Sequence, residues 1–139
     1  MREYAFHLHK NWLNDDFFEA TLSLQSHDAA VNLDIYTDTE ELHDLYQKLI
    51  HFSTTMAKEE MVWITGGEAP TFNHYVYMRF FKYNVVGKIA VEVKVKKHTE
   101  APYAMSAHFF LFTYLAGVDD LARQLEKMIS GEAIEAFGL

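Results

Sequence analysis

Between residues 88 and 96 apolar and polar side chains alternate one by one, the clearest repeat in the chain. Side chains of a β-strand point alternately to the two faces of its sheet, so this pattern predicts a strand with one buried and one solvated face. Strands of a doubly wound parallel sheet are buried on both faces, and the alternation argues against that fold. The expected buried positions are Ile89, Val91, Val93 and Val95, and the solvated ones are Lys88, Ala90, Glu92, Lys94 and Lys96.

Further strands are expected on both sides of this one. The segment Asn84–Gly87 favours a hairpin to a preceding strand that is apolar or aromatic on both faces. Short connections of this kind favour antiparallel pairing. The other strand candidates are Tyr4–His9, Phe17–Gln25, Ala29–Tyr36, Met61–Thr65, Tyr75–Tyr83 and Ala107–Leu115.

Two amphipathic helices are expected as well. The first runs from Thr39 to about Ala57, because the segment Thr37–Glu41 offers capping side chains and early acids. The second begins after Gly117 and stops at Gly131. Apolar residues recur at helical spacing in both. The expected stripes are Leu42, Leu45, Tyr46, Leu49, Phe52 and Met56, and then Val118, Leu121, Ala122, Leu125, Met128 and Ile129, with Asp119 and Asp120 in the first turn of the second helix.

The composition is that of one folded domain. The chain has 139 residues, of which 50% are hydrophobic and 15% aromatic, so it can bury a sizeable core. We therefore predict a single α+β domain over residues 1–139, with a mostly antiparallel sheet and two amphipathic helices packed on one face. The expected element order is β-β-β-α-β-β-β-β-α.

The surroundings of the chain are indicated by what it lacks. It has no cysteine, which excludes disulfides and thiolate sites. Its first ten residues lack the apolar core of a signal peptide. The longest apolar stretch, Phe109–Val118, is well short of the ~20 residues that a membrane-spanning helix needs. We expect a cytoplasmic protein that does not engage a membrane.

The sequence contains no motif that identifies a catalytic reaction or a bound cofactor. His7 and His9 would share one strand face, but two ligands do not close a zinc site. The chain contains no nucleophile elbow, no Walker phosphate loop and no dinucleotide-binding glycine pattern. We therefore expect a non-enzymatic protein without metal or cofactor. A small-ligand-binding or enzymatic domain, with a pocket between sheet and helices, stays open as an alternative.

Aromatic residues exceed what one buried sheet face needs, with 11 Phe, 8 Tyr and 2 Trp. Some should lie on the face away from the helices, where they would form a homodimer interface or a binding groove unless another segment covers them. Lysines 88, 94 and 96 would lie nearby, and such a mixture can bind single-stranded nucleic acid. The net charge of −8 opposes phosphate binding, and Glu92 interrupts the lysine row, so no nucleic-acid partner is expected.

The acidity is concentrated in one half of the chain. Residues 1–70 hold 13 Asp and Glu against 4 Lys and Arg, whereas residues 71–139 hold 7 against 8. Such an asymmetry can produce a negative field that a basic protein partner would feel. The acids that we expect to bind such a partner are Asp15, Asp16, Asp38, Glu40, Glu41, Asp44, Glu59 and Glu60.

The succession of segments resembles a bacterial family of small immunity proteins linked to wall-associated polymorphic toxins, the WapI type. Four places carry the resemblance: Asn11–Leu13 before the strand Phe18–Leu24, the strand and capped helix start in Leu33–Leu42, the strand Gly87–Val93 after a hairpin, and Phe109–Phe112 before Val118–Leu121. The resemblance implies a protein that binds and neutralises a cognate toxin. Toxins that attack nucleic acids are commonly basic, which matches the acidic half. A homo-oligomeric bacterial protein assembled through its aromatic sheet face is a further alternative.

Overall fold

The structure, a computed structural model, describes residues 4–11 and 17–139. Within these residues it has the expected α+β class, and the expected order of elements is confirmed through the second helix. One short strand follows that helix. The elements are β1 (Phe6–Lys10), β2 (Phe17–Gln25), β3 (Ala30–Asp38), α1 (Thr39–Thr54), β4 (Met61–Gly66), β5 (His74–Lys82), β6 (Lys88–Lys97), β7 (Met105–Tyr114), α2 (Leu115–Ser130) and β8 (Glu135–Gly138).

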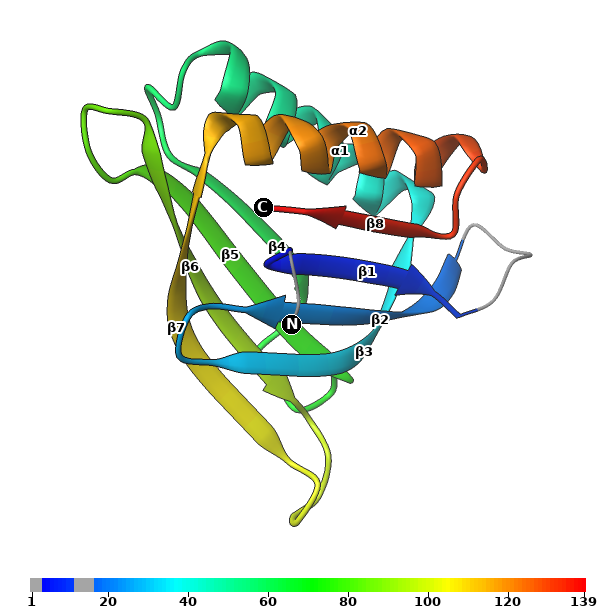
Figure 1. The fold of residues 1–139 in the computed structure, drawn as a ribbon. Coiled ribbons are helices and arrows are strands. Elements are labelled where there is room, and N and C mark those ends of the chain that lie inside the picture. The colour runs from blue at the N-terminus through cyan, green and yellow to red at the C-terminus, as the bar shows by residue number, and fades with distance from the viewer. Residues whose placement is uncertain (1–3, 12–16) are drawn as a thin grey trace.

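The strands form two four-stranded sheets where the sequence suggested one. The first sheet has the order β3-β2-β1-β8 and the second β4-β5-β6-β7, and all neighbours are antiparallel. Figure 1 shows the sheets crossing each other, with the two helices together along one side of the molecule. The helix α1 connects the first sheet to the second. The strand pattern of the sequence does not show which strands share a sheet, so it did not predict two sheets.

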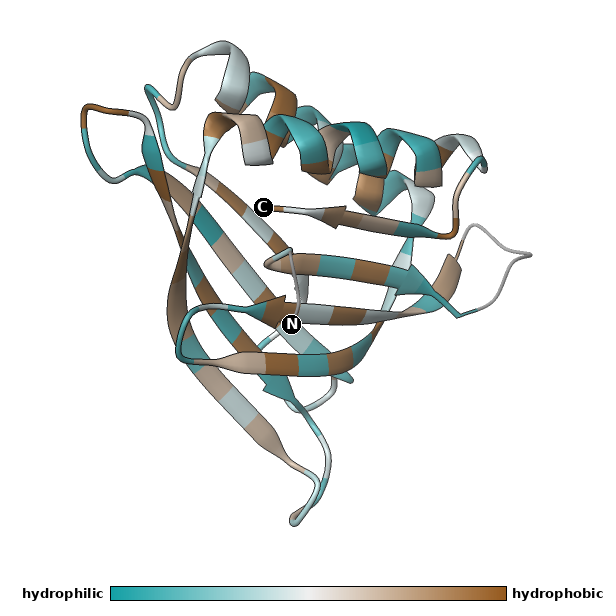
Figure 2. Cartoon of the chain, in the orientation of Figure 1, coloured by the Kyte–Doolittle hydropathy of each residue, from teal (hydrophilic) through white to brown (hydrophobic). Residues whose placement is uncertain are grey.

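The core lies between the two sheets and the helices. Each sheet turns one row of side chains inward, and the alternation of hydrophobic and hydrophilic residues along β1 and β2 is visible in Figure 2. The largest fully buried side chains include Trp63, Phe6, Phe52 and Phe80. Full burial of a side chain of this size stabilises the fold by about 1.5–3 kcal/mol. The four inward residues of β6 are at most 1% exposed, as its alternation predicts. On its other face, Ala90 and Glu92 are also buried, contrary to the expectation that they are solvated.

The first helix begins as expected and ends earlier. Asp38 caps it, because its Oδ1 accepts a hydrogen bond of 2.6 Å from the backbone N–H of Glu41. The last helical residue is Thr54, and the left-handed backbone of Met56 and Ala57 follows. Met56 is consequently 68% exposed and does not belong to the buried stripe. The buried stripe consists of Leu42, Leu45, Leu49 and Phe52.

The second helix begins two residues before Gly117, not after it. Asp119 and Asp120 therefore lie outside its first turn, contrary to expectation. Glycine is needed within the helix because a Cβ at Gly117 would lie 2.2 Å from Oγ1 of Thr113, at the end of β7. The helix ends at Gly131 in the left-handed conformation, as expected.

The short strand β8 was not expected, because four residues are too few to show a period. It pairs with β1 and lies against α2. Gly138 permits this approach, since a Cβ there would lie 2.5 Å from Cβ of Leu121. His7 of β1 holds the strand from the other side: its Nε2 is 2.9 Å from a carboxylate oxygen of Glu135, and its ring stacks on Phe137. Among the described residues, no helix is long and apolar enough to cross a membrane.

The contact between β8 and α2 predicts the effect of one added methyl group. Gly138→Ala should lower the free energy of unfolding by about 1–3 kcal/mol, because the backbone of α2 cannot give way as a flexible side chain could. The control is Glu132→Ala, at an exposed position in the preceding connection, which should change stability by less than about 0.5 kcal/mol. Urea unfolding followed by circular dichroism measures both, and equal effects would contradict the close approach.

Candidate functional site

The outer face of the second sheet carries the most unusual surface of the described residues. In β7, exposed Phe110, Phe112 and Tyr114 alternate with buried Leu111 and Thr113. The three exposed rings keep 45%, 45% and 56% of their surface in solvent. We call this outer face the platform. It consists of Tyr77, Arg79 and Phe81 of β5, Lys88, Glu92, Lys94 and Lys96 of β6, and Ser106, His108, Phe110, Phe112 and Tyr114 of β7.

The rings of the platform contact one another across neighbouring strands. Phe81 and Phe110 meet edge to face with their centroids 6.5 Å apart, although β6 lies between their strands. Phe112 meets Tyr83, at the base of the β5–β6 hairpin, at 5.0 Å. Such pairs contribute about 0.5–1.5 kcal/mol beyond their buried area, so two cross-strand ring pairs stabilise this face.

Each of three cations lies over one of these rings. The Nζ of Lys88 is 4.6 Å from the centroid of Phe112, and the Nζ of Lys94 is 4.9 Å from that of Tyr77. The guanidinium of Arg79 lies 4.3 Å from the ring of Phe81. Ring faces are electron-rich and attract cations, so these contacts hold the charges close to the sheet. The lysine row expected on β6 is thus present, and it is embedded among aromatic rings.

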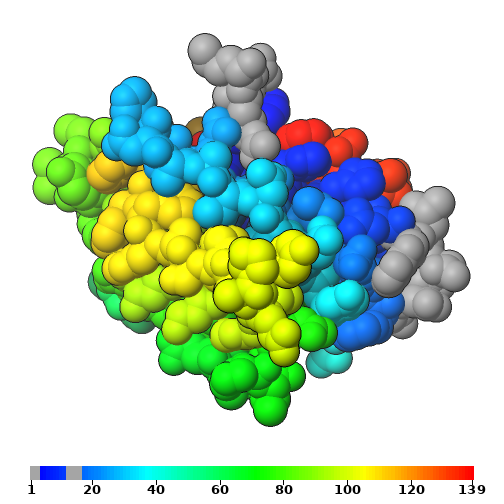
Figure 3. Space-filling model, turned by 90° about the horizontal axis from the view of Figure 1, so that it is seen from below, coloured from blue at the N-terminus to red at the C-terminus, as the bar shows by residue number. Residues whose placement is uncertain are grey.

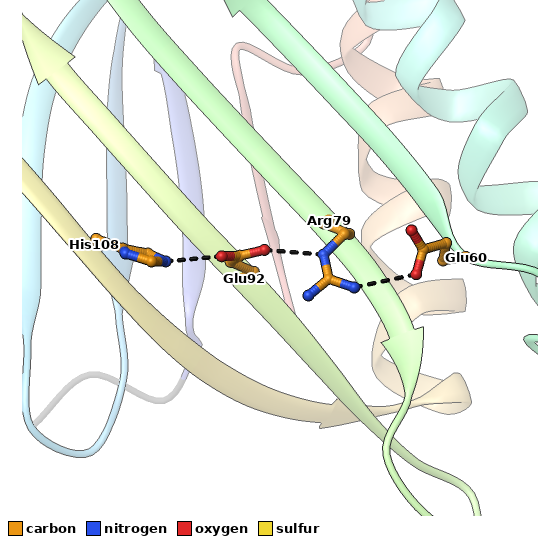
Figure 4. Close-up of polar contacts among 4 residues, drawn as sticks. All are labelled: Glu60, Arg79, Glu92 and His108. Carbon is orange, nitrogen blue, oxygen red and sulfur yellow. Dashed lines mark hydrogen bonds and ion pairs between the residues drawn. The ribbon is translucent and has the colours of Figure 1, made fainter.

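A chain of hydrogen-bonded polar side chains crosses the platform (Figure 4). Arg79 of β5 is its centre: Nε donates to Oε1 of Glu92 at 2.9 Å, and Nη1 donates to Glu60, just before β4, at 3.1 Å. The other carboxylate oxygen of Glu92 lies 2.8 Å from Nε2 of His108 on β7. Only 9% of Glu92 is exposed. The nearly buried carboxylate of Glu92 therefore joins β5, β6 and β7, and Arg79 extends the chain to Glu60.

Hydrogen bonding decides the charge state of this carboxylate. The hydrogen bond from Arg79 is the main cause that lowers the pKa of Glu92, and the bond from His108 lowers it further. Burial acts in the opposite direction but is outweighed. Glu92 in turn raises the pKa of Arg79. Both groups are ionised at neutral pH, and the platform carries four permanent cations against one anion.

The loops at one end of the second sheet lie close together. The Nε2 of His98, which follows β6, lies 2.8 Å from the carbonyl oxygen of Gly67. The backbone N–H of His98 donates to the carbonyl oxygen of Asn73. Figure 3, which views the molecule from below, shows the β6–β7 loop in yellow beside the β4–β5 loop in green. A hollow beside His98 is also lined by Lys96, Lys97 and Glu100, so charges of both signs lie at this end of the platform.

The acids proposed from the sequence fall into several places. Asp15 and Asp16 lie outside the described residues. Asp38 is used as the helix cap, and Glu40 is exposed in the first turn of α1. Glu41 turns inward: one carboxylate oxygen accepts hydrogen bonds from hydroxyl groups of both sheets. These three acids thus serve the start of α1, and of the three Glu40 alone presents its side chain fully to solvent.

The other three proposed acids meet in one groove. Asp44, Glu59 and Glu60 line it between α1 and the start of β4. Lys48 and His51 lie in the same groove, and Lys48 Nζ is 3.4 Å from Asp44. Glu60 is also bonded to Arg79, so the groove borders the platform. The structure brings these three acids together, and Glu40, one turn before Asp44 on α1, does not line the groove.

A buried polar cluster surrounds Glu41. Its Oε1 accepts a hydrogen bond of 2.6 Å from Thr37 of β3 and another from Thr65 of β4. The Oγ1 of Thr65 is 3.2 Å from Nε2 of His74, which is 4% exposed. Since the single hydroxyl proton of Thr65 goes to Glu41, Nε2 of His74 is the donor and its Nδ1 carries no proton. The cluster joins α1 to both sheets.

Burial is the main cause that lowers the pKa of His74, and the nearby His98 adds to the effect. The histidine is therefore neutral in the folded protein at neutral pH. In the pair His7 and His9, which the sequence places on one strand face, His7 is bonded to Glu135. Within residues 4–11 and 17–139, no three His, Asp or Glu side chains are grouped as a metal ion would require.

The ion-pair chain escaped the sequence analysis, although a signal for it exists. A hairpin centred between Val85 and Val86 places residue 79 opposite residue 92, and the structure has this register. The opposite charges at these two positions therefore predict a cross-strand pair. The contribution of His108 had no such signal, because it depends on the longer β6–β7 connection.

The comparisons with known proteins add no relative. No protein-family model matches this chain, and no similar protein was found among curated proteins or solved structures. The arrangement of side chains alone carries the functional argument.

A double-mutant cycle tests the ion-pair chain. Arg79→Met alone should lower the free energy of unfolding by about 2–4 kcal/mol, because the nearly buried Glu92 loses its main partner. Glu92→Met alone should cost less, since the more exposed Arg79 can turn to water. The loss of stability in the double variant should be at least about 1 kcal/mol smaller than the sum of the two single losses. Additive effects, measured by urea unfolding at neutral pH, would contradict coupling between the two groups.

The pH dependence of stability tests His74. Its folded pKa lies below the unfolded value of about 6.5, so the unfolded state takes up the proton first. Stability should fall as the pH is lowered from about 7.5 to about 5, by up to about 1.4 kcal/mol per pH unit from this group alone. His74→Gln should remove this part of the slope. An identical slope in the variant, determined by urea unfolding across the range, would show that His74 does not contribute.

Proposed function

We propose that this protein is a non-enzymatic binding module that docks a partner protein on the platform. One observation carries the proposal: exposed aromatic rings and cations lie together on one continuous sheet face. Contact between exposed aromatic rings and water is unfavourable. A partner that covers the rings removes this apolar area from solvent, which favours binding. Aromatic residues and arginine are also the side chains that dominate binding energy at protein interfaces.

The charges of the platform indicate the chemistry of the partner. Arg79, Lys88, Lys94 and Lys96 face it with Glu92 as the only anion among the platform side chains. A complementary surface presents acidic side chains beside apolar ones. A protein fits this better than a nucleic acid, because the chain as a whole carries −8 and repels a dense row of phosphates.

The polar groups of the platform support a binding role over a catalytic one. His108 is hydrogen-bonded to Glu92, an arrangement that can orient a general base. Its side chain is 55% exposed on an open sheet face, however, and not in a hollow from which water is excluded. The space between sheets and helices, where a pocket was the alternative expectation, is occupied by packed apolar side chains.

A second candidate is the immunity-type function suggested by the sequence, with a basic protein as partner. The groove that holds Asp44, Glu59 and Glu60 favours it, because three acids converge there beside exposed helix surface. Lys48 and Arg79 already neutralise part of this charge, which places the candidate second.

The two candidates are separated by paired variants. The purified protein is used to capture partners from a lysate of its source organism, and each captured partner is then purified and titrated by calorimetry. Phe110→Ser with Phe112→Ser should weaken platform binding by about 100-fold or more, since two interface anchors are lost. Asp44→Lys with Glu59→Lys, both in the acidic groove, is the control and should change the affinity for a platform partner by less than about threefold.

Each outcome is decisive. Loss with the aromatic variant alone supports the platform, and loss with the acid variant alone supports the basic partner. A partner whose affinity is insensitive to both pairs overturns both candidates. Binding of a single-stranded oligonucleotide that is lost with the aromatic variant would overturn the assignment of the platform to a protein.

A further inference from the structure

Three of the four sheet edges are protected by features of the fold. The edge strand β8 lies against α2. On β4, the Nζ of Lys48 donates to the carbonyl oxygen of Val62 at 3.0 Å and so satisfies an edge acceptor. The third edge, β3, carries the charges of Asp34 and Asp38. Native proteins use such charges and covers to prevent edge strands from pairing with other chains.

The fourth edge, β7, has none of these protections. Its ten residues contain no Lys, Arg, Asp, Glu or Pro. Among the residues that the structure describes, β6 is the only strand with which it pairs. The β2–β3 turn, Tyr4 and Leu139 approach its middle, and a hollow remains between them and Phe110 and Phe112. A ten-residue edge without Lys, Arg, Asp, Glu or Pro is a template for strand addition.

We propose that β7 pairs antiparallel with β7 of a second copy of this chain, so that the second sheets of two protomers join into one sheet of eight strands. The charge pattern selects a second copy as the occupant. An uncharged strand meets its own copy without like-charge repulsion, and its rings gain aromatic neighbours across the new strand pair. Face-to-face association of two platforms, by contrast, would bring Lys88, Lys94 and Lys96 of both copies together.

The symmetry of this pairing leaves the platforms free. Two antiparallel copies of one strand are related by a two-fold axis, and the pairing is self-complementary. An axis perpendicular to the sheet keeps the outer faces of both copies on the same side. The two platforms then become one extended surface, with Phe110 and Phe112 near its middle. The pairing does not depend on the proposed function, because it uses the backbone edge and not the exposed ring faces.

Sedimentation velocity and hydrogen exchange together test the pairing. The protein should change from monomer to dimer as its concentration rises from about 1 to about 500 µM. Amides of residues 105–114 should exchange more slowly at the high concentration, because their free edge becomes hydrogen-bonded. A monomer over the whole range overturns the proposal. So does a dimer in which exchange of β7 is unchanged, since its copies would meet elsewhere.

A matched pair of variants provides the second test. Ser106→Glu with Phe112→Glu adds charges at exposed positions of β7 and should weaken the dimer by at least about tenfold. His43→Glu with Gln47→Glu adds two charges at exposed positions of α1, and its dimer should stay within about twofold of the wild type. Circular dichroism confirms that each variant is folded. An unchanged dimer in the β7 variant, or equal weakening in both, overturns the proposal.

Discussion

The alternation of side chains along β6 is the constraint on which the rest of the structure depends. Its inner row, from Ile89 to Val95, is buried against the first sheet and the helices. A shift of one residue would turn these side chains to water and bring lysines into the core, so the register is strongly specified. The outer row is fixed by the same choice. The platform is therefore the necessary reverse side of the core strand, and its lysines lie where the buried valines place them.

Glu92 gives this outer face its definite arrangement. A nearly buried carboxylate is costly unless it is paired and hydrogen-bonded. Arg79 and His108 provide these bonds from the two neighbouring strands. The requirement to satisfy one carboxylate thus aligns side chains across β5, β6 and β7, with rings on both sides of the charges. The result is a mixed surface with fixed cations, which differs from a simple apolar patch in selecting partners by charge.

The charge asymmetry of the sequence takes a spatial form in this fold. In the first half, Asp38 caps α1, Glu41 bonds it to the two sheets, and further acids line the groove beside it, whereas the second half builds a cationic platform. Several acids singled out from the sequence thus have structural roles, because side chains at a helix start are the first to be used as caps. The separation of acidic groove and cationic platform is a property of the surface that no composition count contains.

The sequence by itself determined the element types. Period-two and helical patterns located the strands and helices through α2, and the Asn84–Gly87 turn implied the register that pairs Arg79 with Glu92. The helix ends near Met56 and Gly117 differ from the expected positions, because backbone conformation and packing at these residues decide them. Only the tertiary structure decided that there are two sheets, that β8 completes one of them, and that β7 is left as an unprotected edge. These features depend on contacts between residues far apart in the chain, for which a local pattern has no signal.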